Sequence, residues 1–153
     1  MAGATFAANL VCPERALFEG RASAVSCRTS DGLITVQNLH TPFVADVLPG
    51  VVTIETGSEV LRVLVHGGFL QVATGPGLDT EAEGLGSTVT VLAGVAELVS
   101  EIDVARAEAA KSGAEAALSA LNSSNDDEHA AAKRQSIEGD LARAELRIAT
   151  ASK

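Results

Sequence analysis

The sequence predicts a β plus α fold, in which an N-terminal antiparallel β-sandwich is followed by a C-terminal antiparallel two-helix hairpin. Three observations predict it. All four prolines and all four phenylalanines of the 153-residue chain precede residue 77. Short segments of β-branched or alternating residues recur in the same region, separated by turn formers. After Ser100 the chain becomes rich in Ala, Glu, Arg and Leu. We therefore expect two domains, residues 1–98 and 99–153.

Seven segments of the first domain have the composition of strands. A βαβ arrangement needs helices of about ten residues or more between strands, and no intervening segment fits one. Many short strands with frequent turns favour a sandwich or barrel. The predicted strands are Thr5–Val11, Ala22–Arg28, Leu33–Gln37, Val51–Thr56, Val60–His66, Gly68–Ala73 and Thr88–Ala93. The predicted turns are Glu19-Gly20, Ser30-Asp31-Gly32, Pro49-Gly50, Gly57-Ser58 and the Gly-rich stretch 75–87.

The second domain reads as two helices joined by a polar break at residues 122–127. Ser100 is the predicted N-cap of the first helix, which runs to about Leu121, and Asn125 with Glu128 caps the second. A short loop between two helices implies an antiparallel hairpin. Its seam is predicted from 4-3-4 spacing: Ala110, Ala114, Ala117 and Leu121 against Ile137, Leu141, Ala144 and Ile148. Alanines bury little area, so the hairpin either docks on the sandwich or leaves it as an extended arm.

Charge and composition exclude several classes of function. The chain has 11 basic and 20 acidic residues, a net charge of -9 and a pI of about 4.7, which argues against nucleic acid or anionic lipid as its main partner. The start of the chain resembles no signal peptide, and no apolar run approaches the roughly 18 residues of a membrane span. The two cysteines, Cys12 and Cys27, fit reduced strand residues better than a disulfide or metal site. We expect a cytoplasmic protein.

Motifs for catalysis are scarce. The sequence contains no phosphate-binding loop of the Gly-x-x-x-x-Gly-Lys-Ser/Thr type, and Gly75-x-Gly77 is not followed by a third glycine at the required spacing. The histidines His40, His66 and His129 lack zinc-ligand spacing, and the default for His66 is a structural role at a strand end. We therefore predict no catalytic residues and no metal site.

One group of residues suggests a ligand. Ile102-Asp103-Val104-Ala105-Arg106-Ala107 opens the first helix, and Arg143 and Arg147 share one face of the second. A helix N-terminus and three guanidinium groups can hold a chain of phosphates, while Asp103 can accept hydrogen bonds from a base or ribose. The alternative is ordinary surface charge, with Asp103 and Arg106 as a common i, i+3 pair. Spacing alone leaves both interpretations open.

Short motifs in a fixed order cover nearly the whole chain. They include Pro13-Glu14, Asp31-Gly32, His40-Thr41-Pro42, Leu48-Pro49-Gly50, the segment 65–72 (VHGGFLQV), the segment 89–93 (VTVLA) and Glu101-Ile102-Asp103. In this order and spacing the sequence resembles the epsilon subunit of bacterial F-type ATP synthases. The resemblance implies a ten-stranded sandwich with a helical hairpin. It also implies a subunit of the rotating central stalk without a catalytic site of its own.

The resemblance further implies partners and a regulatory role. The sandwich would bind the gamma subunit and the c ring, with Asp31, Gly32 and His40 as candidate contacts, at the cytoplasmic face of the bacterial membrane. The hairpin would move to an extended state that reaches the alpha and beta subunits and inhibits ATP hydrolysis. No cofactor is required, but ATP is a candidate regulatory ligand of the folded hairpin. In the family that site is the motif Ile/Leu-Asp-x-x-Arg-Ala with a pair of arginines on the second helix. The matching residues here are Ile102, Asp103, Arg106, Ala107, Arg143 and Arg147.

Four departures from the family pattern bear on these roles. Leu33 stands where many members have an acid, and Asn38-Leu39 replaces Pro-Gly before His40. Gly113 stands where some ATP-binding members have arginine, and the stretch 75–87 is longer than usual for its turn. Two other classes remain open on sequence grounds. One is a free-standing β-sandwich binding module with a helical tail, and the other is a small hydrolase that uses a cysteine or histidine.

Overall fold

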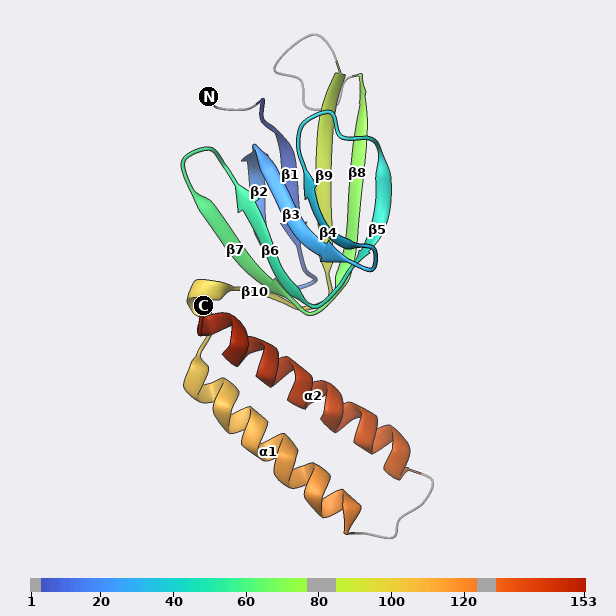
Figure 1. Cartoon of the computed structure of the whole chain (residues 1–153), viewed down its shortest axis with the longest axis vertical. Coiled ribbons are helices and arrows are strands. Elements are labelled where there is room, and N and C mark those ends of the chain that lie inside the picture. Colours follow the sequence, from blue (N-terminus) through green and yellow to red (C-terminus); the bar gives the residue numbers. More distant parts are fainter. Residues whose placement is uncertain (1–3, 77–84, 124–128) are drawn as a thin grey trace. The chain divides into compact units, whose positions relative to one another are not determined.

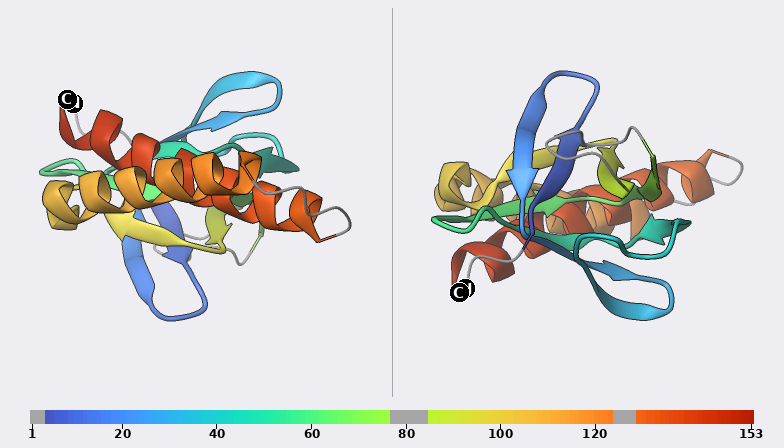
Figure 2. Two further views of the ribbon diagram at one scale, coloured as in Figure 1. Left: turned by 90° about the horizontal axis from the view of Figure 1, so that it is seen from below. Right: turned by 90° about the horizontal axis from the view of Figure 1, so that it is seen from above.

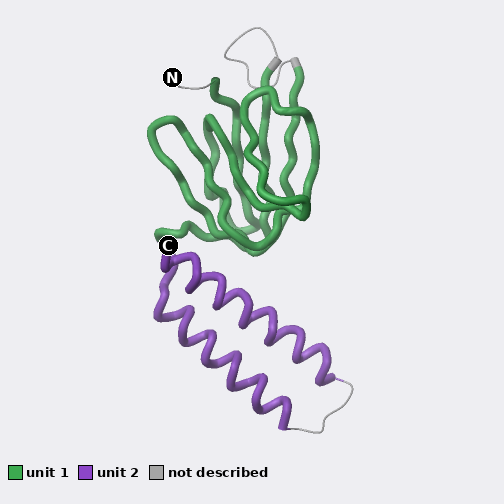
Figure 3. Tube along the Cα trace, viewed as in Figure 1, with its two compact units in different colours: residues 1–100 green, residues 101–153 purple. Residues whose placement is uncertain are grey.

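The computed structural model describes residues 4–76, 85–123 and 129–153. The chain divides into two compact units, residues 1–100 and 101–153 (Figure 3). Unit 1 contains the strands and unit 2 the helices. The sequence places this division between residues 98 and 99, and the contacts place it between Ser100 and Glu101.

The described part of unit 1 contains ten strands (Figure 1). This is the number that the family resemblance implies. Their bounds are β1 Phe6–Val11, β2 Ala16–Ala22, β3 Ala24–Thr29, β4 Gly32–Val36, β5 Phe43–Val47, β6 Gly50–Glu55, β7 Val60–Val65, β8 Gly68–Pro76, β9 Leu85–Ala93 and β10 Ala96–Leu98. A short 3-10 helix, η1 (Val99–Glu101), follows them.

The strands are hydrogen-bonded in the order β10-β7-β6-β3-β5-β8-β9-β1-β2, and β4 pairs with the other side of β3. The ladder between β3 and β5 consists of one pair, Thr29 with Val47, so the sheet folds there into two layers (Figures 1 and 2). The predicted sandwich is therefore confirmed. One ladder departs from the antiparallel prediction, because β1 pairs with β9 in parallel.

The core of unit 1 lies between the two layers and is almost entirely aliphatic. Phe6 is the aromatic residue among its largest fully buried side chains, and the rest are Leu, Ile and Val. Alternation along the strands produces this core, since buried residues alternate with more exposed ones along Phe6–Val11 of β1, Val51–Glu55 of β6 and Thr88–Ala93 of β9. A chain without Trp or Tyr thus fills its sandwich with β-branched side chains, which favour strands.

Three strands, β2, β5 and β10, were not predicted individually. The sequence Glu19-Gly20 suggests a turn, but Gly20 lies inside β2 and pairs with Ala8. The ring of Phe18 lies 3.4 Å from the position of a Cβ on Gly20, so it covers the backbone that a glycine leaves open. At β5 the small and acidic residues Ala45 and Asp46 hide the alternation. Strand β10 has three residues, too few for a periodic signal.

The Gly-rich stretch 75–87 is partly strand rather than entirely turn. Antiparallel pairing of β8 with β9 continues through Thr74–Ser87 and Gly75–Gly86 to the pair Pro76–Leu85. Residues 77–84 lie outside the described residues, so the prediction of an unusually long turn is not tested there.

Unit 2 consists of α1 (Val104–Asn122) and α2 (Ala130–Ala151), which run side by side in all views (Figures 1 and 2). Ser100 was wrongly predicted as the first N-cap. Asp103 caps α1 instead, because its extended backbone and short carboxylate suit an N-cap and Ser100 lies within η1. Residue His129 occupies the N-cap position of α2 without a side-chain cap. The predicted caps Asn125 and Glu128 lie outside the described residues.

The seam of the hairpin follows the prediction on α2 and departs from it in part on α1. Ala144 is buried, and Ile137, Leu141 and Ile148 are partly buried on the same face. On α1 the buried residues are Ala107 and Ala114, while Ala110 is exposed. Three of the four predicted residues, Ala114, Ala117 and Leu121, are buried or partly buried as predicted. The seam of α1 also includes Ala107, Lys111 and Leu118. Lys111 was missed because a lysine was not expected at a seam position.

The turn between β7 and β8 brings two backbones unusually close. Gly67 has φ of +101°, which glycine adopts without strain. A Cβ on the next residue, Gly68, would lie 2.1 Å from the carbonyl oxygen of Leu92 on β9. The Gly67-Gly68 pair therefore fulfils two separate requirements, one of conformation and one of space.

We expect Gly68→Ala to destabilise unit 1 by roughly 2–3 kcal/mol, because strands β8 and β9 must separate to admit the methyl group. Chemical denaturation of the full chain measures this change. Gly94→Ala is the matched control, since a Cβ there meets nothing within 4 Å. Equal stability of the two variants would contradict the close approach of Gly68 to Leu92.

Candidate functional site

The predicted nucleotide motif lies at the start of α1. Asp103 is the N-cap, and its Oδ1 accepts a hydrogen bond from the backbone N–H of Arg106 at 3.0 Å. The N–H of Ala107 donates to the carbonyl of Asp103 at 3.0 Å and closes the first turn. Asp103 and Ala107 therefore shape the helix terminus, while the Arg106 side chain is exposed to solvent. Ile102, partly buried, precedes the cap.

Two contacts between the helices define one face of the hairpin. Lys111 Nζ lies 3.4 Å from Glu145 Oε1, and Arg134 donates to Asn122 Oδ1 at 2.7 Å. Both contacts give the same register between the two antiparallel helices. In this register Ala109 of α1 lies at the same level along the hairpin as Arg147 of α2, and Gly113 at the same level as Arg143. This register places predicted residues from the two helices near one another.

The three predicted arginines lie on the opposite face. At about 100° per residue, Arg106 is roughly 140° from Lys111 around α1. Arg143 and Arg147 are each roughly 160° from Glu145 around α2. At 1.5 Å per residue, the levels of Arg147 and Arg143 lie about 5 Å and about 10 Å along the axis from Arg106. The three predicted arginines thus occupy one face of the hairpin, as a row of positions that crosses the two helices.

The arginines of this row differ in their surroundings. Arg143 is exposed and forms an ion pair with Asp140, one turn earlier on α2. Arg147 is partly buried and also interacts with a neighbour. An anion that bound here would compete with Asp140 for Arg143. The row offers charge-assisted hydrogen bonds to an extended anion rather than a closed pocket for a single one.

Gly113 lies on the same face, about 20° from Arg106 around α1 and level with Arg143. A Cβ on Gly113 meets nothing within 4 Å, so the helix has room for a larger side chain. The structure therefore allows the arginine that some related ATP binders have at this position, but this chain has none there.

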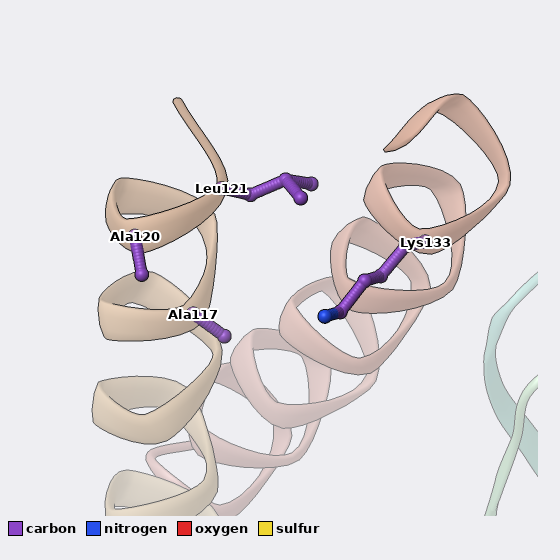
Figure 4. A pocket seen from close by; sticks show the side chains of 4 residues that line it. All are labelled: Ala117, Ala120, Leu121 and Lys133. Atoms are coloured by element: carbon purple, nitrogen blue, oxygen red, sulfur yellow. The ribbon is translucent and has the colours of Figure 1, made fainter. Parts of the chain in front are cut away.

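A pocket of about 280 Å³ lies between the C-terminal end of α1 and the N-terminal end of α2 (Figure 4). It is lined by Ala117, Ala120 and Leu121 of α1 and by Lys133 of α2. The side chains of Leu121 and Lys133 point across the space between the helices (Figure 4). None of these residues belongs to the predicted nucleotide site, so the pocket and the arginine row are separate features.

The candidate partner contacts Asp31, Gly32 and His40 lie in two loops of unit 1. Asp31 and Gly32 form the exposed end of the β3–β4 hairpin, where Gly32 has φ of +124°. His40 packs its ring against Phe43, with the ring centroids 5.1 Å apart, and its carbonyl accepts a hydrogen bond from Thr74. The side chain of Asp31 is thus exposed to solvent, whereas His40 also contacts Phe43 and Thr74 and helps to hold its loop.

The residue before His40 adopts a conformation that normally requires glycine. Leu39 has φ of +60°, the one positive value at a described residue other than glycine. Its N–H donates to the Oγ of Ser87, a fully buried side chain, at 2.8 Å. This position corresponds to the glycine of the Pro-Gly pair that the sequence comparison showed to be replaced. The hydrogen bonds to β8 and β9 hold the strained loop in place.

The thiols and histidines form no nucleophilic site in the described part of the chain. Cys27 is fully buried, and burial raises the pKa of its thiol to about 11, so the reactive thiolate is scarce at neutral pH. Cys12 donates to the carbonyl of Arg15. His66 lies 3.4 Å from Glu97 at the end of β7, which fits the predicted structural role. The described residues contain no cluster of three or more potential metal ligands.

Comparison with known proteins identifies the family. Residues 5–75 match the family model described as ATP synthase, Delta/Epsilon chain, beta-sandwich domain. The ATP synthase epsilon chain of Halalkalibacterium halodurans is 37% identical over 123 residues, covering 80% of this chain and 84% of that one. The epsilon chain of Ruminococcus albus is 35% identical over 150 residues, covering 98% of both. This chain belongs to the ATP synthase epsilon chain family.

The resemblance seen in the sequence is therefore confirmed. The two alternatives, an unrelated binding module and a small hydrolase, receive no support from these matches. As an epsilon chain, the protein is a non-catalytic subunit of ATP synthase. Among solved structures, a chain of the Euglena gracilis mitochondrial ATP synthase OSCP/F1/c-ring assembly aligns with a TM-score of 0.69. The alignment covers 97% of this chain and 82% of that one at 22% identity, which supports the fold. Within the residues described, neither helix is both long and apolar enough to cross a bilayer.

We expect Leu39→Gly to stabilise this epsilon chain by about 1 kcal/mol, because glycine removes the strain of a left-handed leucine. The side chain is 54% exposed, so its loss sacrifices little buried area. Thermal or chemical unfolding of the full chain measures the effect. Leu39→Ala, which retains a Cβ, is the control, and equal or lower stability of the glycine variant would contradict the strain.

Proposed function

We propose that this chain is the epsilon subunit of the central stalk of a proton-translocating ATP synthase. In this role unit 1 binds the gamma subunit and touches the c ring, at the cytoplasmic face of the bacterial membrane. The observation that carries the proposal is the match to bacterial epsilon chains over nearly the full length, including the hairpin. The division of the chain into two compact units supports separate tasks for the sandwich and the helices.

The hairpin is proposed to act as a conformational brake on ATP hydrolysis. Its seam contains alanines and a lysine where larger apolar residues would bury more area. Two helices held by such a seam separate at a small cost in free energy. In the extended state the freed helices would reach the alpha and beta subunits and block rotation in the direction of hydrolysis.

ATP is proposed as the ligand that favours the closed hairpin. Arg106, Arg143 and Arg147 come from both helices and share one face, so a triphosphate that engaged all three would hold the helices together. Asp103 keeps one carboxylate oxygen in the cap and would use the other to accept a hydrogen bond from the ribose or base. Ile102 and Ala107 would shape the end of the helix beside it. The role of ATP is regulatory, and no step of catalysis occurs here.

We expect Arg143→Ala to weaken ATP binding about tenfold or more, because a charge-assisted hydrogen bond to phosphate contributes about 1.5–3 kcal/mol. Isothermal titration calorimetry of ATP into the full chain measures the affinity. The matched control is Arg134→Ala, since Arg134 lies on the same helix but contacts Asn122 on the opposite face. If wild type and both variants gave equal binding heats, or if none of them gave a binding heat, the arginines would be ordinary surface charges and the proposed ATP site would be refuted.

Removal of residues 101–153 is expected to leave a folded unit 1 that still binds the gamma subunit, because the sandwich has its own core. The assembled enzyme should then hydrolyse ATP faster than the enzyme with the full chain. Measuring gamma binding and steady-state ATP hydrolysis side by side tests both halves of the proposal. A truncated chain that bound gamma but left hydrolysis unchanged would refute the brake, and failure of the full chain to bind gamma would refute the assignment to the stalk.

A further inference from the structure

The seam of the hairpin contains a charged residue. Lys111 of α1 lies between the seam residues Ala107 and Ala114, which are both buried. The side chain of Lys111 is 39% exposed, so it is partly buried at a position that faces α2. A lysine at a seam position lowers stability relative to an apolar residue, and it keeps its ammonium group in water at the edge of the seam. What Lys111 contributes therefore depends on the partners of that group.

The ammonium group of Lys111 has one carboxylate partner on each helix. Its Nζ lies 3.4 Å from Glu145 Oε1 of α2 and 3.9 Å from Glu115 Oε1, one turn further along α1. The two carboxylates are similarly exposed, at 52% and 56%. The pair with Glu115 lies within one helix, so it persists when the helices separate. The pair with Glu145 exists only while the hairpin is closed.

The Lys111–Glu145 pair and the arginine row lie on opposite faces of the hairpin. The row has like charges from both helices, at Arg106, Arg143 and Arg147, and these oppose closure until an anion binds among them. Lys111 and Glu145 have unlike charges, which favour closure without a ligand. A substitution in this pair therefore changes closure without removing any group of the arginine row.

We propose that the Lys111–Glu145 pair is a latch that sets the fraction of hairpins closed before a ligand binds, and through it the apparent affinity for ATP. The effect on closure concerns unit 2 alone, while the effect on ATP and on the brake rests on the proposed function. A ligand that binds only the closed hairpin has an apparent Kd equal to its intrinsic Kd divided by the closed fraction. Lys111 and Glu145 are thus positioning residues, which act on ATP without contacting it.

The test compares Glu145→Gln with Glu115→Gln in the full chain. Both substitutions remove one negative charge and one partner of the same ammonium group, so any general change in the attraction of ATP is equal in the two variants. Glu145→Gln should lower the ratio of closed to open hairpins roughly two- to fivefold, the range for an exposed ion pair. Glu115→Gln should leave this ratio unchanged. Exchange of the two charges, Lys111→Glu with Glu145→Lys, should restore it.

Closure is measured as the distance between two nitroxide labels by electron paramagnetic resonance. The labels are placed at Ser112→Cys on α1 and Ala142→Cys on α2, two exposed positions. Cys12 is replaced by serine, and Cys27 is fully buried. Urea is raised until half of the wild-type hairpins are closed, with helix content followed by circular dichroism. Calorimetry at that urea concentration should show the apparent Kd for ATP rising as the closed fraction falls in Glu145→Gln.

The outcomes separate the latch from the proposed function. Equal loss of closure in Glu145→Gln and Glu115→Gln, or no loss in either, overturns the latch. Failure of the exchanged pair to restore closure overturns it as well, because an ion pair across the seam depends on unlike charges and not on which helix has which. Loss of closure with unchanged ATP affinity overturns the link between the latch and ATP. A wild-type chain whose closure responds to Glu145→Gln but that gives no binding heat with ATP refutes ATP as the ligand and leaves the latch in place.

Discussion

Burial of aliphatic side chains between two layers of strands is the interaction on which unit 1 depends. The layers share one backbone pair between β3 and β5, Thr29 with Val47, so apolar contact rather than backbone hydrogen bonding joins most of their area. Each fully buried Val, Leu or Ile contributes about 1.5–3 kcal/mol. The close approach of Gly68 to β9 and the strained Leu39 follow from the same packing, because both permit loops to lie tightly against this core.

Unit 2 is held by a different balance of forces. Its helices have high intrinsic propensity, since alanine is the best helix former, but alanines bury little area where the helices meet. Lys111 occupies a seam position and reaches Glu145 on the other helix, an exposed pair of the kind that contributes at most about 1 kcal/mol. The hairpin therefore combines high helix propensity with little buried area between its helices. That combination suits a part that changes its partner without unfolding.

The sequence predicts the architecture well because alternation and helical periodicity are local signals. It predicts details poorly where a tertiary contact decides the outcome. Gly20 has the sequence signature of a turn residue, but it lies within β2, where Phe18 covers it. Asp103 rather than Ser100 caps α1, because Ser100 lies in a 3-10 turn that precedes the helix. On α1 the seam prediction included the exposed Ala110 and omitted the partly buried Lys111, because it used only apolar residues. At the site, spacing predicted the arginines of each helix, but only the register of the hairpin shows that all three share a face.

The parallel pairing of β1 with β9 has a consequence for how the protein is made. Ala7, near the start of the sequence of unit 1, pairs with Thr88, near the end of that sequence. A strand synthesised among the first residues must therefore wait for a strand synthesised near the end of the unit, and contacts of such long sequence separation slow folding. On the ribosome the sandwich closes only after β9 has emerged, so β1 stays without this neighbour while the strands between them are synthesised. The helices of unit 2 follow β9 along the chain, so they leave the ribosome after the strands that complete the sandwich.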